Sequence, residues 1–239
     1  MKKKTRARSS GAVIVDVDGT LVDSNDAHAR AWVEAFEAEG ITVPFSRVRR
    51  CIGMGGDKLM PDVAGISEDS AQGARIAERR ADIFKKKYLP QIQPFPRVRE
   101  LLQRFVDDGL TLAVASSAKE DELTPLLACA GAETLISART SSDDAENSKP
   151  DPDIVVAALA EVKTRRAVML GDTPYDISAA SGAGIPIVGL ECGGWTREEL
   201  VGAVAVYRDP ADLLAQYAGS PFAALASGRE PTGASTRTS

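Results

Sequence analysis

The sequence GAVIVDVDGTLVDSNDAHARAW, residues 11–32, begins with an apolar run and then places two aspartates one residue apart. The apolar run predicts a β-strand that is buried on both faces, as in a parallel sheet covered by helices. In an extended strand the side chains at i and i+2 point the same way, so Asp16 and Asp18 are expected on one side of the strand's end. Two carboxylates this close repel each other, and a neighbouring cation would relieve that repulsion.

After residue 90, short apolar runs alternate with helical patterns. The predicted strands are residues 12–16, 111–116, 167–170, 185–189 and 204–207. The predicted helices between them are residues 97–108, 120–130, 153–162 and 174–182. This alternation is typical of α/β proteins, and we predict a Rossmann-like core with a parallel sheet sandwiched by helices.

Residues 25–91 interrupt the alternation, because they have helical periodicity but no convincing strand. Their length far exceeds the roughly dozen residues that a crossover between parallel strands needs. We therefore predict a helical cap domain inserted after the first strand, with residues 11–24 and 92–217 forming the core. The basic residues 1–10 and the Gly-, Ser-, Thr- and Pro-rich residues 218–239 are expected to be disordered.

The chain of 239 residues has a formal net charge of -5, which argues against binding to nucleic acid or to an anionic membrane surface. No apolar run approaches the roughly 20 residues that cross a bilayer, and no signal peptide follows the basic start, so a cytoplasmic protein is expected. Three widely spaced cysteines and one histidine fit neither a disulfide framework nor a thiolate zinc site.

Polar residues follow the first two predicted strands. Asp16 and Asp18 would suit a hard divalent ion such as Mg²⁺, which binds carboxylate oxygens, water and substrate phosphate. The next two residues, Gly19 and Thr20, permit a tight turn with backbone amides aimed at an anion. After the second strand, the hydroxyl of Ser116 could donate to a phosphate, although a serine in this position alone is more often a helix N-cap.

Three charged residues follow later elements of the sheet. Lys149 precedes Pro150, which keeps it extended just before a helix, although a single lysine is usually solvated. Asp172 follows a buried strand and could simply cap the next helix, and Asp176 would share its face if that turn is helical. All of these residues follow predicted parallel strands, and open α/β sheets bind ligands at the strands' carboxyl ends. Their shared position favours one joint site.

The segments DVDGTLVDS, ASS, SKPDPD and GDTPYDISAA together resemble the four motifs of the haloacid dehalogenase superfamily, in the small-cap subgroup that includes phosphoglycolate phosphatases and β-phosphoglucomutases. The resemblance covers residues 12–208. It implies that Asp16 is a nucleophile that takes up a phosphoryl group and that Asp18 is the general acid and base. Ser116 and Lys149 would neutralise and orient the phosphoryl group.

The resemblance also implies a magnesium site. Its ligands would be the carboxylates of Asp16 and Asp172 and the backbone carbonyl of Asp18, with Asp176 binding through water or supporting them. Dehalogenating members of the superfamily lack the second aspartate of the first motif, so Asp18 favours phosphoryl transfer.

Several residues are candidates for substrate binding. His28 matches a histidine that assists the general acid in related enzymes, or it is simply a polar residue on the first cap helix. The glycine-rich segment CIGMGGDKL, residues 51–59, would form a cap loop that faces the active site. The candidate substrate-binding residues are Gly19, Thr20, His28, Gly55, Gly56, Lys58 and Ser117.

We thus predict a Mg²⁺-dependent phosphatase acting on a small phosphorylated metabolite such as a sugar phosphate or phosphoglycolate. One alternative is a phosphomutase of the β-phosphoglucomutase type, but the arginine expected in the cap loop is replaced by glycine, and Arg49 or Lys58 would compensate only partly. Another is a noncatalytic signalling module that accepts phosphate on aspartate, against which the cap and Asp18 argue. The oligomeric state and the physiological substrate are left open by the sequence.

Overall fold

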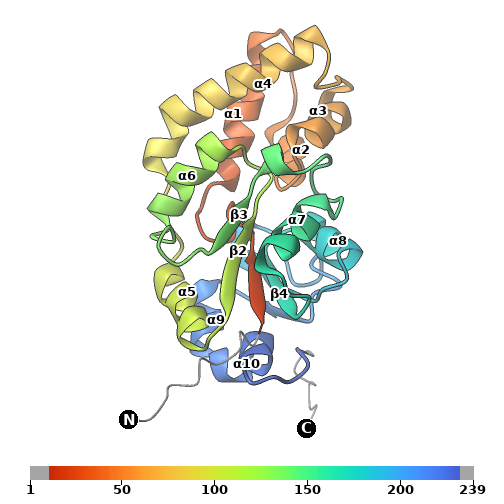
Figure 1. The fold of residues 1–239 in the computed structure, drawn as a ribbon. Helices are drawn as coiled ribbons and strands as arrows, with labels where there is room; N and C mark the ends of the chain where they lie inside the picture. Colours follow the sequence, from red (N-terminus) through yellow and green to blue (C-terminus); the bar gives the residue numbers. More distant parts are fainter. Residues whose placement is uncertain (1–10, 232–239) are drawn as a thin grey trace, which may run out of the picture.

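The computed structural model describes residues 11–231, and its centre is a six-stranded sheet in which every neighbouring pair of strands is parallel (Figure 1). The strand order is β3-β2-β1-β4-β5-β6. The strands are β1 (Ala12–Val15), β2 (Thr111–Ala115), β3 (Ala138–Thr140), β4 (Ala167–Gly171), β5 (Ile187–Leu190) and β6 (Ala205–Tyr207). Ala12 pairs with both Thr111 and Ala167, so β1 lies between β2 and β4.

Helices cover both faces of this sheet, which confirms the predicted fold class. The core helices are α5 (Val98–Asp107), α6 (Glu120–Cys129), α7 (Asp153–Val162), α8 (Pro174–Gly182), α9 (Pro210–Ala215) and α10 (Pro221–Ala226). The first four match the predicted helices to within one residue at each end. Strand β3 was not predicted, because its sequence Ala-Arg-Thr has no apolar run and its register comes from pairing with β2.

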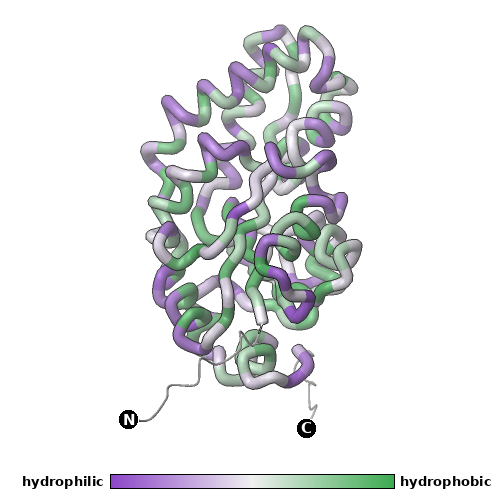
Figure 2. Tube along the Cα trace, in the orientation of Figure 1, coloured by the Kyte–Doolittle hydropathy of each residue, from purple (hydrophilic) through white to green (hydrophobic). Residues whose placement is uncertain are grey.

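The two faces of β1 pack into different parts of the core. Val13 and Val15 join the apolar cluster that includes Phe105 of α5, whereas Ala12 and Ile14 join the cluster that includes residues of α7 and α8. This alternation follows from the two-residue period of a strand. Both sets are fully buried, as the unbroken hydrophobicity of the segment predicts, and Figure 2 shows the hydrophobic residues concentrated in the central strands.

The cap lies at one end of the sheet, between β1 and β2 in the chain (Figure 1). Its helices are α1 (Asn25–Ala38), α2 (Phe45–Cys51), α3 (Gly56–Ala64) and α4 (Ala71–Ile83), followed by the π-helical turn η1 (Phe84–Tyr88) and the 3₁₀ turn η2 (Leu89–Gln91). It has an apolar cluster of its own, in which Trp32, Phe36, Leu59 and Ile76 take part. The chain thus has a helical insertion after the first strand, where the alternation of strand and helix patterns in the sequence is interrupted.

The expectation of disorder after residue 217 is wrong for α10. Ser220 caps this helix by accepting a hydrogen bond from the backbone N–H of Ala223, and Pro221 occupies its first turn. Phe222 and Leu225 are buried, and the ring of Phe222 lies 4.7 Å from that of Phe105. The Gly- and Ser-rich composition concealed these helix-start signals. The expectations for residues 1–10 and 232–239 concern positions outside the described residues.

The helices are short. The longest among the described residues, α1, has 14 residues. Within residues 11–231, none of the helices has both the length and the apolar character that crossing a membrane requires.

Because α10 packs on the core, it should contribute measurably to the free energy of unfolding. We predict that Phe222→Ala lowers the free energy of unfolding by about 3–5 kcal/mol, because it empties a fully buried aromatic site against Phe105. The matched control is Val201→Ala, which truncates a side chain that is 78% exposed and should change the free energy by about 0.5 kcal/mol or less. Urea denaturation measures both. Equal losses in the two variants would show that α10 does not pack on the core.

Candidate active site

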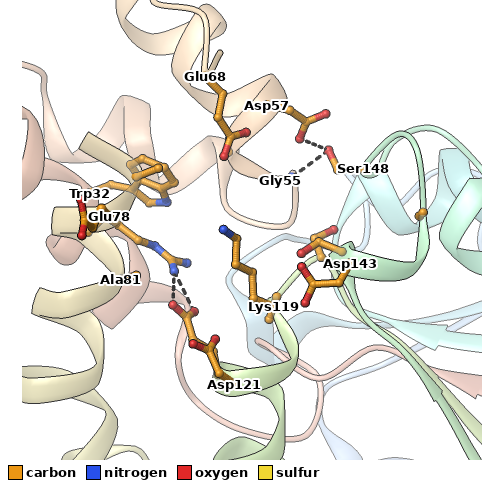
Figure 3. Close-up of a pocket in the computed structure, with 18 of the residues that line it drawn as sticks. Trp32, Gly55, Asp57, Glu68, Glu78, Ala81, Lys119, Asp121, Asp143 and Ser148 are labelled. Carbon is orange, nitrogen blue, oxygen red and sulfur yellow. Dashed lines mark hydrogen bonds and ion pairs between the residues drawn. The ribbon is translucent and has the colours of Figure 1, made fainter. Parts of the chain in front are cut away.

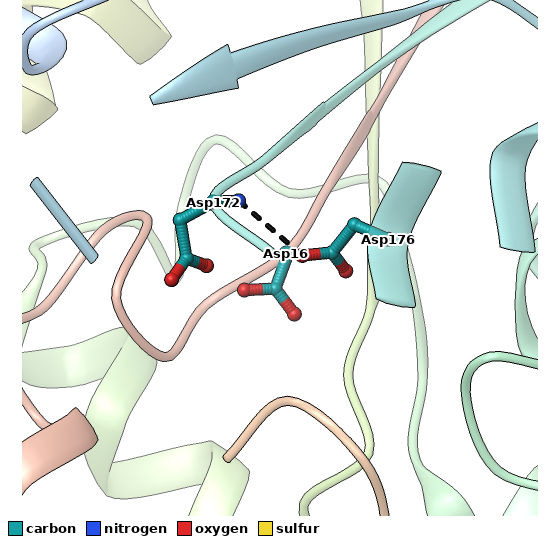
Figure 4. Close-up of side chains that lie close together, drawn as sticks. All are labelled: Asp16, Asp172 and Asp176. Atoms are coloured by element: carbon teal, nitrogen blue, oxygen red, sulfur yellow. Dashed lines mark hydrogen bonds between the residues drawn. The ribbon is translucent and has the colours of Figure 1, made fainter. Parts of the chain in front are cut away.

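Three aspartates meet at the carboxyl ends of β1 and β4 (Figure 4). Asp16 follows β1, Asp172 follows β4, and Asp176 lies in the first turn of α8. All three are buried, and one carboxylate oxygen from each lies within 4.8 Å of the others. The structure therefore brings together the three carboxylates that the sequence placed after two different strands.

The N-terminus of α8 determines which of these carboxylates takes part in the helix cap and which one is available to the site. Thr173 is the N-cap residue: its hydroxyl oxygen accepts a hydrogen bond from the backbone N–H of Asp176 at 3.1 Å. In return, Oδ2 of Asp176 accepts hydrogen bonds from the backbone N–H of Thr173 at 3.0 Å and from its hydroxyl at 2.7 Å. Asp172 is therefore not the helix cap, and its carboxylate is available to the site.

Lys149 lies between two of the carboxylates. Its Nζ is 2.5 Å from Oδ1 of Asp16 and 2.7 Å from Oδ1 of Asp176, and only 1% of its side chain is exposed. Burial opposes the charged form of this lysine, but the two aspartates outweigh burial and raise its pKa above the usual range. Lys149 is thus a buried ammonium group paired with two carboxylates rather than a solvated surface lysine.

One ammonium group does not balance three buried carboxylates. Burial, together with the charge of Asp176, raises the pKa of Asp16 to about 7 against the opposing effect of Lys149. Burial and the charges of Asp16 and Asp176 raise the pKa of Asp172 well above its usual value. The excess negative charge and the all-oxygen donor set fit a hard divalent cation such as Mg²⁺.

Asp172 is held in place by the segment that follows β1. The hydroxyl of Thr20 donates to its Oδ1 at 2.9 Å, and Nδ2 of Asn25 donates to its Oδ2 at 3.0 Å. Gly19 has a φ of +77°, and a Cβ atom there would lie 2.3 Å from Oδ2 of Asp172, so only glycine fits. That the backbone amides of Gly19 and Thr20 face an anion stays a prediction. The roles of the Thr20 hydroxyl and of Asn25 in orienting Asp172 were not anticipated from the sequence.

Asp18 accepts two hydrogen bonds through one oxygen. Ser24 donates its hydroxyl to Oδ1 at 2.5 Å, and Nε2 of His28 lies 2.8 Å from the same atom. Burial by itself would raise the pKa of Asp18, but the His28 ring, the Ser24 hydroxyl and the charge of Arg80 outweigh burial and lower it. Asp18 is therefore ionised in this arrangement.

The proton positions on His28 follow from its second partner. Nη2 of Arg80 lies 3.0 Å from Nδ1 of His28, and a guanidinium group can only donate. Nδ1 therefore accepts, and Nε2 carries the proton that is donated to Asp18. The histidine ring also stacks on Phe84 with its centroid 3.9 Å away. His28 is thus a positioned partner of Asp18 rather than a solvated cap residue.

Arg80 joins the cap to the core. It lies on α4, and its Nη1 donates to both carboxylate oxygens of Glu122 on α6 at 2.7 Å. Glu122 is only 1% exposed, so this ion pair is shielded from solvent. Neither residue was anticipated from the sequence, because a charged side chain on a helix is ordinarily solvated.

The loop between α2 and α3 rests on the core. Ser117 donates its hydroxyl to the carbonyl of Gly53 at 3.3 Å, and the backbone N–H of Gly55 donates to the hydroxyl of Ser148 at 3.1 Å. Ser116 is buried and accepts from the backbone N–H of Ala118 at 3.1 Å, whereas the N-cap position of α6 belongs to Lys119. The N-cap interpretation of Ser116 is therefore wrong.

Two cations near this loop are already paired. Nζ of Lys58 lies 2.9 Å from a carboxylate oxygen of Asp151. Arg49 forms an ion pair of 2.6 Å with Asp26 and donates to the carbonyl of Gly193 at 2.5 Å. Neither residue lines the cavity between cap and core, whereas Gly55, Gly56 and Ser117 do. That cavity has a volume of about 620 Å³ (Figure 3).

The chain is similar in sequence and in fold to known proteins. Residues 13–190 match the family model described as haloacid dehalogenase-like hydrolase. A phosphoglycolate phosphatase from Caulobacter vibrioides is 32% identical over 213 residues, which cover 85% of this chain and 90% of the relative. A hydrolase structure from Pseudomonas syringae superposes with a TM-score of 0.81 at 32% identity, covering 87% of this chain and 97% of that one.

A third match includes a bound sugar. The CbbY protein from Rhodobacter sphaeroides, solved as a mutant in complex with xylulose-(1,5)bisphosphate, is 26% identical, with a TM-score of 0.70 over 84% of this chain and 95% of its own. The chain belongs to the haloacid dehalogenase-like hydrolase family. Within that family it is an enzyme of the phosphatase type.

The Arg80–Glu122 pair provides a test of how cap and core are joined. We predict that Glu122→Ala lowers the free energy of unfolding by about 3 kcal/mol, because it leaves the largely buried guanidinium of Arg80 without its counter-charge. The control is Glu120→Ala, which removes an exposed carboxylate paired with Arg139 and should cost about 1 kcal/mol or less. Chemical denaturation monitored by circular dichroism distinguishes them. A loss for Glu122→Ala as small as the control's would contradict the buried ion pair.

Proposed function

We propose that this enzyme is a cytoplasmic, Mg²⁺-dependent phosphatase that hydrolyses a small phosphorylated metabolite, of the sugar phosphate or phosphoglycolate type, through an aspartyl-phosphate. The observation that carries the proposal is the buried cluster in which Asp16 contacts Lys149 beside Asp172, with Asp18 only two residues away. The similarity to a phosphoglycolate phosphatase and to a protein solved with a sugar bisphosphate supports the substrate type.

The metal would be held by the carboxylates of Asp16 and Asp172 and by the backbone carbonyl of Asp18. Both carboxylate oxygens of Asp176 already have partners in Thr173 and Lys149. Asp176 would therefore position the neighbouring groups rather than bind the metal directly. When bound, Mg²⁺ supplies positive charge against the phosphate oxygens and the buried carboxylates.

In the first half of the reaction, a carboxylate oxygen of Asp16 attacks phosphorus. Because Lys149 engages Oδ1 of Asp16, the other oxygen is the one available for attack. The bond between phosphorus and the ester oxygen breaks, and the leaving alkoxide takes a proton from Asp18. The phosphoryl oxygens are bound by Lys149 and by Ser116, which lies at the carboxyl end of the adjacent strand β2. These contacts hold phosphorus in line between the attacking and leaving oxygens.

In the second half, Asp18 takes a proton from water, and the resulting hydroxide attacks phosphorus. The bond to Asp16 breaks and inorganic phosphate leaves. The lowered pKa of Asp18 suits this step, since the group must be ionised to accept a proton. For the first half Asp18 must be protonated, and the negative charge of an entering phosphate ester shifts its pKa in that direction.

The structure favours hydrolysis over phosphomutase activity. A mutase must bind a second phosphate at the cap, and the two cations that might replace the missing loop arginine are occupied, Arg49 by Asp26 and Lys58 by Asp151. Neither lines the cavity.

Phosphate release from a panel of phosphorylated metabolites, with Mg²⁺ and with EDTA, tests the proposed activity. We predict release that EDTA abolishes, no detectable activity for Asp16→Asn, and a loss of at least about 100-fold in kcat for Asp18→Asn. The matched control is Asp23→Asn, which changes an exposed aspartate in the segment between β1 and α1 and should retain activity. Full turnover by Asp18→Asn would contradict its role, and release from no compound would contradict the function.

The carboxylate cluster also predicts how pH affects stability. Burial raises the pKa of Asp16 from 3.8 to about 7, so between these values the folded metal-free protein binds more protons than the unfolded chain. Its contribution to stability therefore falls as pH rises through this window. Since Mg²⁺ binds the ionised carboxylates, we predict that it raises Tm more at pH 8 than at pH 5. Thermal unfolding with and without Mg²⁺ measures this, and Asp172→Asn should lose most of the increase. An increase that is the same at both pH values would contradict the assignment.

A further inference from the structure

The cavity between cap and core adjoins the reaction centre. Two residues of its wall, Ser117 and Ser148, are the chain neighbours of the phosphoryl-binding residues Ser116 and Lys149. A third, Arg80, contacts the histidine that is hydrogen-bonded to Asp18. Once a phosphate lies beside Asp16, the alcohol part of the ester would therefore occupy this cavity.

The volume of the cavity limits which alcohol fits. At about 620 Å³ it lies within the range of about 300–1,000 Å³ that is typical of sites for drug-sized ligands. A two-carbon group such as glycolate would leave most of this space to water. The cavity is therefore better matched to an alcohol of the size of a sugar or larger.

The charge of the cavity wall is strongly negative. Eight carboxylate side chains and three cationic side chains line it. Two of the three cations are already neutralised, Arg80 by Glu122 and Lys85 by Asp121, each of which also lies in the wall. Among the residues that the structure describes, Lys119 is the one cation of the wall with no ion pair.

Glu68 is the carboxylate best placed to contact a ligand. It lies in the connection between α3 and α4, is half-buried, and has no hydrogen bond or ion pair to any other described residue. Figure 3 shows its carboxylate pointing into the cavity from the cap, with Lys119 extending toward it from the core. Burial and the nearby Asp57 raise the pKa of Glu68, and the charges of Lys119 and Arg80 oppose this rise only partly.

These observations assign a chemical class to the substrate. We propose that the enzyme acts on phosphate monoesters whose alcohol part carries an amine, and that Glu68 binds the ammonium group. This rests on the phosphatase function proposed above and makes it more specific. In a partly enclosed cavity with this excess of carboxylates, an ammonium group is attracted whereas a carboxylate or second phosphate is repelled.

Substrates that differ in one charged group test this. The first series is phosphoethanolamine, 2-hydroxyethyl phosphate and phosphoglycolate, and the second is glucosamine 6-phosphate, glucose 6-phosphate and 6-phosphogluconate. At pH 6.5 and low ionic strength, we expect kcat/KM to be at least about tenfold higher for the amine than for the neutral compound, and lowest for the carboxylate. The larger series should give the higher values, and 0.5 M salt, at which screening acts within about 4 Å, should weaken the order.

The variant Glu68→Gln tests whether Glu68 binds the ammonium group. It should reduce the ratio of kcat/KM for glucosamine 6-phosphate over glucose 6-phosphate at least about fivefold, and Glu68→Lys should reverse the preference. The matched control is Glu161→Gln, which removes an exposed carboxylate on α7 outside the cavity and should leave the ratio unchanged. Far-UV circular dichroism checks that each variant is folded.

The possible outcomes distinguish a failure of the amine preference from a failure of the phosphatase function on which it rests. Phosphate release from no member of either series would overturn the phosphatase function and the inference together. Release with equal rates, or with the carboxylate preferred, would leave the phosphatase intact and overturn the amine preference. An amine preference that persists in Glu68→Gln would overturn the role of Glu68.

Discussion

The site depends on the balance between three buried carboxylates and one buried ammonium group. Lys149 stabilises Asp16 and Asp176 at distances of 2.5 and 2.7 Å but leaves a surplus of negative charge on largely buried carboxylates. That surplus makes a divalent cation favourable, and a bound cation in turn attracts a phosphate dianion. The surrounding structure maintains the imbalance: Thr173 engages Asp176 through the helix cap, while Thr20 and Asn25 hold Asp172.

The parallel sheet explains why residues far apart in the chain reach one point. Every strand delivers its carboxyl end to the same edge, and β1 lies between β2 and β4, so the residues after these three strands are neighbours. The cap then encloses that edge. It brings Arg80 and the glycine loop onto the core, and it contributes Glu68 to the wall of the cavity. In the proposed mechanism the reacting carboxylates lie in the core, whereas side chains of both cap and core line the cavity that would receive the rest of the substrate.

The sequence predicted those features that depend on local pattern. Continuous apolar runs identified five strands, and the paired aspartates at strand ends identified Asp16, Asp172 and Asp176 as neighbours. Features that depend on distant partners were not predictable. Strand β3 is defined by its pairing with β2, and the buried Glu122 has its counter-charge on an arginine 42 residues earlier in the chain. Helix α10 was missed because composition was given more weight than the Ser-Pro start of the helix.

The central claim is that Asp16 carries the phosphoryl group during turnover. It is tested most directly by mixing the Asp18→Asn variant with p-nitrophenyl phosphate and Mg²⁺, quenching with acid, and mapping phosphorylation by mass spectrometry. Because p-nitrophenolate leaves without a proton, the variant should still form the intermediate but hydrolyse it slowly. The account predicts one phosphoryl group on the peptide that contains Asp16, removable by hydroxylamine. A phosphoryl group on Ser116, or turnover without any phosphorylated peptide, would contradict it.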